Sequence, residues 1–258
     1  MHNPLRHSIV AIAITSLTAV MLQSCTKPVR APELGSIYDR AAQHHDPYRN
    51  PVIVIPGILG SQLIEDETQT IVWGAFGGGA ANPDKPDGAR LVALPIDDTT
   101  PLRELRDSVS SNGALDRIKL TVLGLPIELD AYSRILGTLG AGGYRDDQLG
   151  DSGAIDYGDD HYTCFQFDYD WRRDIPENAA RLDAFIDEKR AYVRQAYLDE
   201  YGIDNPDIQF DIVAHSMGGL ITRYMLRYGS ADLPEDGSVP PATWAGADGI
   251  DNVILVGT

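Results

Sequence analysis

Strand-like and helix-like stretches alternate through the second half of the chain. Residues 207–215 (DIQFDIVAH) have the apolar, partly β-branched character of a strand. Residues 217–228 place their apolar side chains on one helical face, and Gly229 is a typical helix end. Residues 252–258 (NVILVGT) form another apolar run, as expected of a strand covered on both faces. Strands joined through helices form a mainly parallel sheet with helices on its faces, so the sequence predicts an α/β domain.

Earlier segments add further elements to this domain. Residues 52–55 (VIVI) are β-branched and stop at Pro56, which predicts a strand buried on both faces. Residues 73–116 are less regular and contain a glycine- and proline-rich stretch, so we expect loop or cap structure there. The other predicted elements are a short strand or hairpin arm at 118–122, a helix at 129–139, a strand at 162–171 and a helix that begins after Asp174.

Ser216 lies at the junction between a predicted strand and a predicted helix. The surrounding sequence, Ala214-His215-Ser216-Met217-Gly218, is close to the G-x-S-x-G pattern of a nucleophile elbow, a sharp turn that exposes a serine. Such a turn crowds the backbone on either side of the serine, so positions 214 and 218 need small residues. The Met217 N–H would then donate to an oxyanion at the helix N-terminus. The alternative is an inert serine in a tight turn.

The turn after the first predicted strand can supply a second oxyanion donor. It reads IPGILG at 55–60, and Gly57 allows the backbone to approach closely. We expect the donor to be the N–H of Ile58, with Leu59 as the next candidate. The alternative is a simple glycine turn without a catalytic role.

The first 50 residues differ in character from the rest of the chain. One arginine precedes an apolar run at 9–22, which is too short for a comfortable membrane span and is typical of a signal-peptide core. The run ends in LQSC, which resembles the lipobox of bacterial lipoproteins. That resemblance implies a signal peptide at 1–24, a lipid on Cys25, and an exported protein anchored at the outer membrane or on the periplasmic side. Residues 25–50 are the predicted lipid-anchored tether; the alternative is an ordinary signal peptide or short anchor, with Cys25 there by chance.

Charge and cysteine content exclude several classes of partner. The formal net charge of −17 disfavours nucleic acid and anionic headgroups as electrostatic partners. The two cysteines are Cys25 and Cys164, so acylation of Cys25 would leave Cys164 without a disulfide partner. The sequence has no CxxC motif and no histidine cluster at ligand spacing, so we expect no metal and no cofactor.

Three segments together resemble one enzyme family. They are PVIVIPGILGSQL at 51–63, YDWRRD at 169–174 and AHSMGG at 214–219. In this order they resemble the lecithin:cholesterol acyltransferase-like branch of the α/β-hydrolases, which includes lysosomal phospholipase and plant phospholipid acyltransferases. The resemblance implies an α/β-hydrolase fold over 51–258 with a cap or lid at 73–125. It also implies a lipase, phospholipase or acyltransferase in which Ser216 forms an acyl-enzyme from a lipid ester or phospholipid, before water or an alcohol takes the acyl group.

Aromatic and charged residues within these segments have a structural interpretation. Trp73 resembles the family's tryptophan in the cap region. Asp170, Trp171 and Arg172 are expected to brace the turn after a strand rather than to contact substrate.

The sequence lacks a credible base for Ser216. A serine hydrolase needs a histidine and an acid, and in α/β-hydrolases both follow the serine in the chain. No histidine follows His215, whose side chain should point away from Ser216, and His161 is expected at the opposite edge of the sheet. We therefore expect an N-terminal part of a longer enzyme, with the acid and base beyond residue 258. The alternatives are a non-catalytic surface lipoprotein with the same fold, and a serine peptidase or thioesterase.

Overall fold

The computed structural model describes most of the chain after the predicted tether. The described residues are 49–74, 81–82, 84–97, 99–100, 104–115, 118–122, 125–129, 131–158, 161–204 and 206–258. They belong to one compact unit, Leu34–Thr258. The predicted signal peptide, Cys25 and most of the tether lie outside the described residues. Within the described ranges, no helix is both long enough and apolar enough to cross a membrane.

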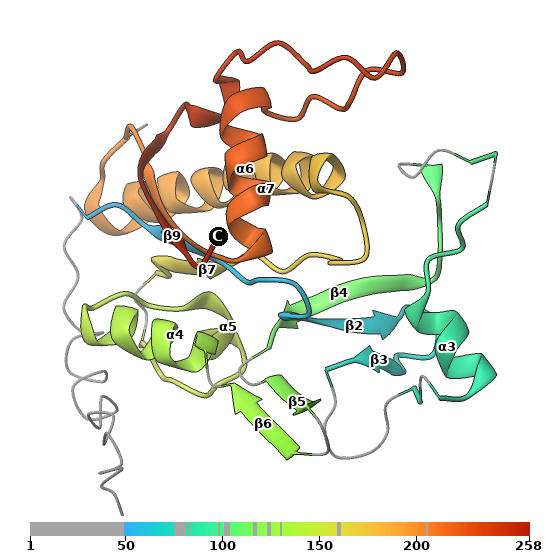
Figure 1. The fold of residues 1–258 in the computed structure, drawn as a ribbon. Helices are drawn as coiled ribbons and strands as arrows, with labels where there is room; N and C mark the ends of the chain where they lie inside the picture. The colour runs from blue at the N-terminus through green and yellow to red at the C-terminus, as the bar shows by residue number, and fades with distance from the viewer. Residues whose placement is uncertain are drawn as a thin grey trace, which may run out of the picture. The chain divides into compact units, whose positions relative to one another are not determined.

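A four-stranded sheet lies between two layers of helices (Figure 1). Its strands, in spatial order, are β7 (Cys164–Gln166), β1 (Val52–Ile55), β8 (Phe210–His215) and β9 (Ile250–Val256). All neighbouring pairs are parallel, and Val52 is aligned with Cys164 on one side and with Asp211 on the other. The fold is therefore α/β with a mainly parallel sheet, as the alternation of strands and helices predicts.

Helices cover both faces of the sheet at β1, but most residues of β9 are exposed, so the expectation of a strand covered on both faces at 252–258 is wrong. The covering helices are α4 (Ala131–Ala141), α6 (Ile175–Tyr201) and α7 (Met217–Tyr228). Side chains alternate along β1, so Ile53 packs in the core shared with α6 and α7, whereas Val54 packs in the cluster that contains Leu136 of α4. All four residues of β1 are buried, which explains the unbroken apolar run.

Capping residues set the ends of α6 and α7, and the sequence predicts those at Asp174 and Gly229. The Asp174 side chain accepts the Glu177 N–H at 2.9 Å and begins α6. Gly202 adopts a φ of 65° and ends α6. Gly229 follows the last residue of α7, as predicted.

A second sheet and several short elements precede or flank this core. The antiparallel strands are, in spatial order, β3 (Ile71–Trp73), β2 (Ser61–Glu65) and β4 (Val109–Ala114), while β5 (Ile118–Val122) and β6 (Leu125–Leu129) form a hairpin. The short helices are α3 (Pro86–Val92), α5 (Asp147–Asp151) and the 3₁₀ helix η2 (Ala245–Ala247). The predicted hairpin arm at 118–122 is confirmed, whereas the sequence does not predict α3 or β4 within the less regular residues 73–116. The β4 sequence, VSSNGA, is short and mostly polar, so it carries no strand-like apolar pattern.

The predicted strand at 162–171 is much shorter in the structure. β7 has three residues, and the following apolar side chains lie outside any strand. Phe167 and Tyr169 are nevertheless buried in the main core. The apolar run at 162–171 therefore reflects burial of a loop as well as strand pairing.

Candidate active site

Ser216 occupies a sharp turn between β8 and α7. Its backbone has φ 49° and ψ −121°, a conformation that residues with a Cβ atom rarely adopt. The Ser216 N–H donates to the Val256 carbonyl oxygen at 2.9 Å, which ties the turn to β9. The side chain is partly buried and follows the carboxyl end of a central parallel strand. This is the edge of an α/β sheet where ligands bind.

Small residues around Ser216 are required by close backbone contacts. A Cβ atom on Gly218 would overlap the Pro56 carbonyl oxygen and lie 2.8 Å from Cγ2 of Ile55. A Cβ atom on Gly219 would overlap the Thr258 side chain. The sequence pattern suggests crowding between positions 214 and 218, but the end of β1 supplies the neighbours that a Cβ at 218 would meet. The turn that carries the serine therefore lies directly against the segment that follows β1.

The segment after β1, residues 56–60, forms a tight loop beside the serine. The Gly60 N–H donates to the Gly57 carbonyl oxygen at 3.0 Å, and Leu59 has a φ of 64°. A Cβ atom on Gly57 would lie 2.9 Å from the Cβ of Ser216, so only glycine fits there. We call residues 56–60 the oxyanion loop, after their predicted role.

The two predicted oxyanion donors, the N–H groups of Met217 and Ile58, belong to the serine turn and to the oxyanion loop beside it. Met217 is the first residue of α7, and a helix leaves its first N–H groups without intrahelical acceptors. Ile58 lies in the oxyanion loop, and its side chain is 54% exposed. Neither the Met217 N–H nor the Ile58 N–H donates a hydrogen bond to another described residue. Two backbone donors are thus left for a ligand next to Ser216.

Two buried tyrosine hydroxyls form hydrogen bonds with the oxyanion loop. The Tyr132 hydroxyl accepts the Gly57 N–H at 2.6 Å and lies 3.0 Å from Nδ1 of His215. The Tyr169 hydroxyl donates to the Pro56 carbonyl oxygen at 2.9 Å. Burial raises the pKa of both phenols, so both stay neutral at ordinary pH. The sequence alone does not indicate these roles, although a buried tyrosine hydroxyl usually has a hydrogen-bond partner.

Two tryptophans support the same loop from its outer end. The Trp73 indole N–H donates to the Leu59 carbonyl oxygen at 3.0 Å, and the Trp171 indole N–H donates to the Ser61 carbonyl oxygen at 3.3 Å. The two indole rings meet edge to face, with 5.6 Å between their centroids. Trp73 therefore fixes the oxyanion loop itself, and Trp171 fixes Ser61, the first residue of β2 after that loop.

Arg172 braces the turn between β7 and α6. Its guanidinium makes two bonds to the Asp170 carboxylate, at 2.7 and 2.9 Å, and contacts Asp107 at 2.7 Å. It also donates to the Leu91 carbonyl oxygen at 3.0 Å. These contacts agree with the structural interpretation of Asp170 and Arg172, since both side chains are almost fully buried.

The two described histidines have partners other than Ser216. Nδ1 of His161 lies 2.8 Å from the Glu200 carboxylate, before the amino end of β7. Because the strands are parallel, this position is at the opposite edge of the sheet from Ser216. Nδ1 of His215 faces Tyr132. No described histidine is therefore placed as the base, and His44 and His45 lie outside the described residues.

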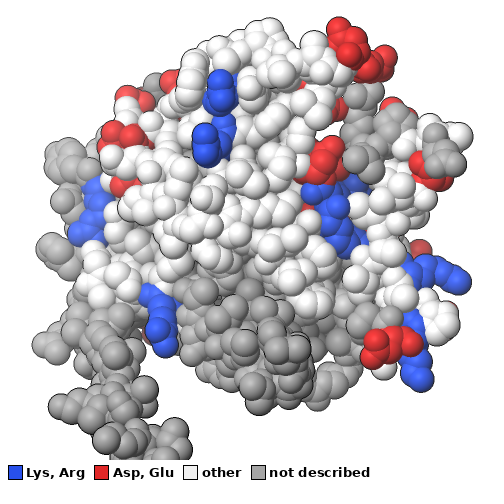
Figure 2. Space-filling model, viewed as in Figure 1, with Lys and Arg blue, Asp and Glu red and all other residues white. Residues whose placement is uncertain are grey.

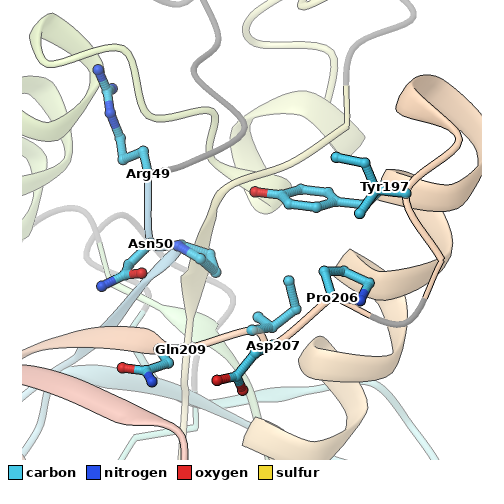
Figure 3. Close-up of a pocket in the computed structure, with 9 residues that line it drawn as sticks. Arg49, Asn50, Tyr197, Pro206, Asp207 and Gln209 are labelled. Carbon is cyan, nitrogen blue, oxygen red and sulfur yellow. The ribbon is translucent and has the colours of Figure 1, made fainter.

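A separate cavity lies at the opposite edge of the sheet (Figure 3). It has a volume of about 200 Å³ and is lined in part by Pro51, Gln209 and Tyr197. Pro51 and Gln209 directly precede β1 and β8, whereas Ser216 follows β8. The cavity therefore does not belong to the serine site. Among the described residues, no three His, Cys, Asp or Glu side chains gather as metal ligands.

The surface near the start of α7 is largely uncharged. Figure 2 shows mostly uncharged side chains in the middle of this face, with charged groups above them and to their right. Leu220, in the first turn of α7, is 49% exposed, and Ile58 on the oxyanion loop is also exposed. This surface offers apolar contact to a ligand of Ser216.

Comparison of the chain with models of known protein families gave no match, and comparison with curated proteins gave none. A serine on a strained turn, two unused backbone N–H groups and an apolar surround are suited to acyl transfer.

Proposed function

We propose that the protein is a serine lipid-ester hydrolase or acyltransferase that acts through an acyl-enzyme on Ser216. The observation that carries this proposal is the strained conformation of Ser216 beside a glycine loop. Strain at a single non-glycine residue is common at active sites, where the surrounding structure enforces it. This conformation costs folding free energy, and a serine without a function would not offset that cost.

We further propose that the sheet and helices form part of an α/β-hydrolase fold. In that fold the nucleophile follows a parallel strand and precedes a helix, and the oxyanion hole combines the next N–H with one from an earlier strand–helix loop. Two features support this proposal: Ser216 and Met217 stand between β8 and α7, and Ile58 follows β1, the neighbour of β8, although the loop that carries Ile58 leads into strand β2 rather than into a helix. The resemblance to the lecithin:cholesterol acyltransferase-like branch is consistent with this arrangement.

The proposed reaction begins when the Ser216 oxygen attacks an ester carbonyl carbon. The serine proton passes to a base, and the carbonyl oxygen becomes an oxyanion that accepts the Ile58 and Met217 N–H groups. Collapse of this intermediate expels the alcohol and leaves an ester on Ser216. Water or a second alcohol then attacks that ester and regenerates the serine.

We propose that the acid and the histidine base lie beyond residue 258, on a segment that covers the outer edge of β9. In the described sheet β9 pairs with β8, and its residues Ile254, Leu255 and Val256 are exposed. An apolar strand edge of this kind favours further pairing. A further strand paired with β9 would widen the sheet along the carboxyl edge, where Ser216 lies.

A lipid ester is the substrate class that the surroundings favour. Exposed Leu220 and Ile58 flank the serine turn, and the surface around it is largely uncharged. The predicted lipid on Cys25 would hold the enzyme at a membrane, where such esters are found. Whether phospholipids or other lipid esters react depends on the cap segment.

The second candidate is a non-catalytic surface lipoprotein with the same fold. The observation in its favour is that the described histidines, His161 and His215, are both engaged elsewhere. The strained serine turn argues against it, because a protein without catalysis gains nothing from keeping that turn.

A fluorophosphonate probe tests the proposal directly. We would label the full-length gene product beside Ser216→Ala, with Ser230→Ala as the control because Ser230 is an exposed serine beyond α7. The proposal expects labelling of the wild type and of Ser230→Ala, and none of Ser216→Ala. An unlabelled wild type under conditions that label a reference serine esterase would favour the non-catalytic lipoprotein.

A further inference from the structure

We propose that Tyr132 is a positioning residue for the oxyanion loop, and that it acts through Gly57 and His215. The inference rests on the proposed function of Ser216, because an oxyanion loop matters only if an oxyanion forms. Tyr132 is in the first turn of α4, 75 residues from Gly57 and 83 from His215 along the chain.

The Tyr132 hydroxyl lies where three segments meet. It is 2.6 Å from the Gly57 nitrogen and 3.0 Å from Nδ1 of His215, which precedes the serine. A Cβ atom on Gly60 would lie 3.0 Å from the same hydroxyl. The Tyr132 side chain is only 2% exposed. One hydroxyl group therefore links the oxyanion loop to the serine turn.

The hydrogen-bond directions follow from counting protons. The Gly57 N–H can only donate, so the Tyr132 oxygen accepts from it. Nδ1 of His215, 3.0 Å away, is the described neighbour placed to accept the hydroxyl proton, and this direction requires the His215 tautomer with its proton on Nε2. In that tautomer Nδ1 bonds Tyr132 and is not free to act as a base.

This network fixes the peptide that carries the Ile58 N–H. The Gly57 carbonyl and the Ile58 N–H belong to one planar peptide and point in opposite directions. The Gly60 N–H holds the Gly57 carbonyl at 3.0 Å, and Tyr132 holds the preceding peptide through the Gly57 N–H. Both dihedral angles of Gly57 are thus restrained. Without the hydroxyl, a glycine would leave the Ile58 donor free to rotate.

Tyr132→Phe separates this role from packing. The phenyl ring keeps its contacts in the cluster with Leu115, Trp73 and Ile135, while the Gly57 N–H loses its acceptor. Tyr157→Phe is a matched control. Tyr157 is also buried, and its hydroxyl also accepts a backbone N–H, that of Asp146 at 3.1 Å, but it lies next to the amino end of β7.

The experiment measures the second-order rate constant of fluorophosphonate labelling on the full-length protein. Loss of a direct oxyanion donor typically slows a serine enzyme by about 100- to 1,000-fold, and an indirect effect through Gly57 should slow labelling by about tenfold. We expect this for Tyr132→Phe and no change for Tyr157→Phe, with similar melting temperatures for the two variants. With a soluble ester, kcat should fall while KM stays constant, because the loop contacts the transition state.

A second variant guards against a folding defect. His215→Phe leaves the Gly57 bond but removes the acceptor of the Tyr132 proton, and we expect labelling to slow by a factor of a few. Because both residues act on one loop, the double variant should label no more slowly than Tyr132→Phe alone. A wild-type labelling rate in Tyr132→Phe would overturn this inference but not the proposed function. If Tyr132→Phe does not fold, a wild-type rate in His215→Phe would have the same meaning. A wild type that is not labelled would overturn the proposed function and this inference with it.

Discussion

The carbonyl oxygen of Pro56 occupies the space that a Cβ atom on Gly218 would need. Pro56 begins the oxyanion loop, and Gly218 is two residues beyond Ser216. The two segments proposed to hold the oxyanion are therefore in backbone contact. Any added atom at this contact must move one segment away from the other.

The first prediction is that Gly218→Ala destabilises the protein and slows labelling of Ser216. A methyl group forced against backbone atoms should cost about 2 kcal/mol or more in the free energy of unfolding, which urea titration would measure. Gly202→Ala is the control, because position 202 has open space but a φ of 65°, and this should cost about 1 kcal/mol. An equal or smaller loss for Gly218→Ala would contradict the contact.

The second prediction concerns the strain at Ser216. The φ of 49° is unfavourable for any residue with a Cβ atom, so Ser216→Ala keeps the strain and Ser216→Gly relieves it. Relief should be worth about 1–3 kcal/mol, which exceeds the added chain entropy of glycine in the unfolded state. We expect Ser216→Gly to unfold at higher denaturant concentration than Ser216→Ala. The reverse order would mean that the turn is not strained.

Local sequence patterns were sufficient for the parts of the fold that place the serine. Apolar, β-branched runs predict the strands β1 and β8, and apolar side chains on one helical face predict α7. The serine turn follows from small residues at fixed positions around Ser216. These signals are contained within a few consecutive residues, so a single sequence reveals them.

The supports of the oxyanion loop could not be predicted in the same way. Tyr132 has the spacing of an ordinary apolar helix residue, and its partner Gly57 is 75 residues away. Tyr169 likewise reads as part of a strand, yet it lies in a loop and bonds Pro56. Such contacts depend on how distant segments pack, and one sequence carries no direct signal of that packing.

The third prediction is that Arg172 contributes strongly to stability. Arg172→Met would leave the buried Asp170 carboxylate and the partly buried Asp107 carboxylate without their principal cation, and the nearby Arg173 would compensate only in part. Removing one partner of a buried ion pair typically costs about 3–5 kcal/mol, so we expect a loss near the lower end of that range. Arg190→Met is the control: its partner Asp187 is largely exposed, so urea titration should show a loss below about 1 kcal/mol. Similar losses for the two variants would contradict the prediction.

The last prediction is a pH dependence of stability that arises at Asp147. Burial and the neighbouring Asp146 raise the pKa of the Asp147 carboxyl from 3.8 to about 6, although Lys189, 3.4 Å away, acts in the opposite direction. A raised pKa means that the folded state binds this proton more tightly than the unfolded state. The contribution to stability is therefore complete below about pH 4 and is lost as the pH rises through about 6.

Asp147→Asn removes this titration, so the variant should gain on the wild type between pH 4 and pH 7. Each tenfold change in proton affinity is worth about 1.4 kcal/mol, so the gain should approach about 3 kcal/mol. The measurement is the difference in unfolding free energy between wild type and variant across that range. Asp199→Asn, at an exposed position of α6, controls for the loss of one carboxylate. A difference for Asp147→Asn that stays constant from pH 4 to pH 7 would mean that its carboxylate is as well solvated in the folded protein as in the unfolded chain.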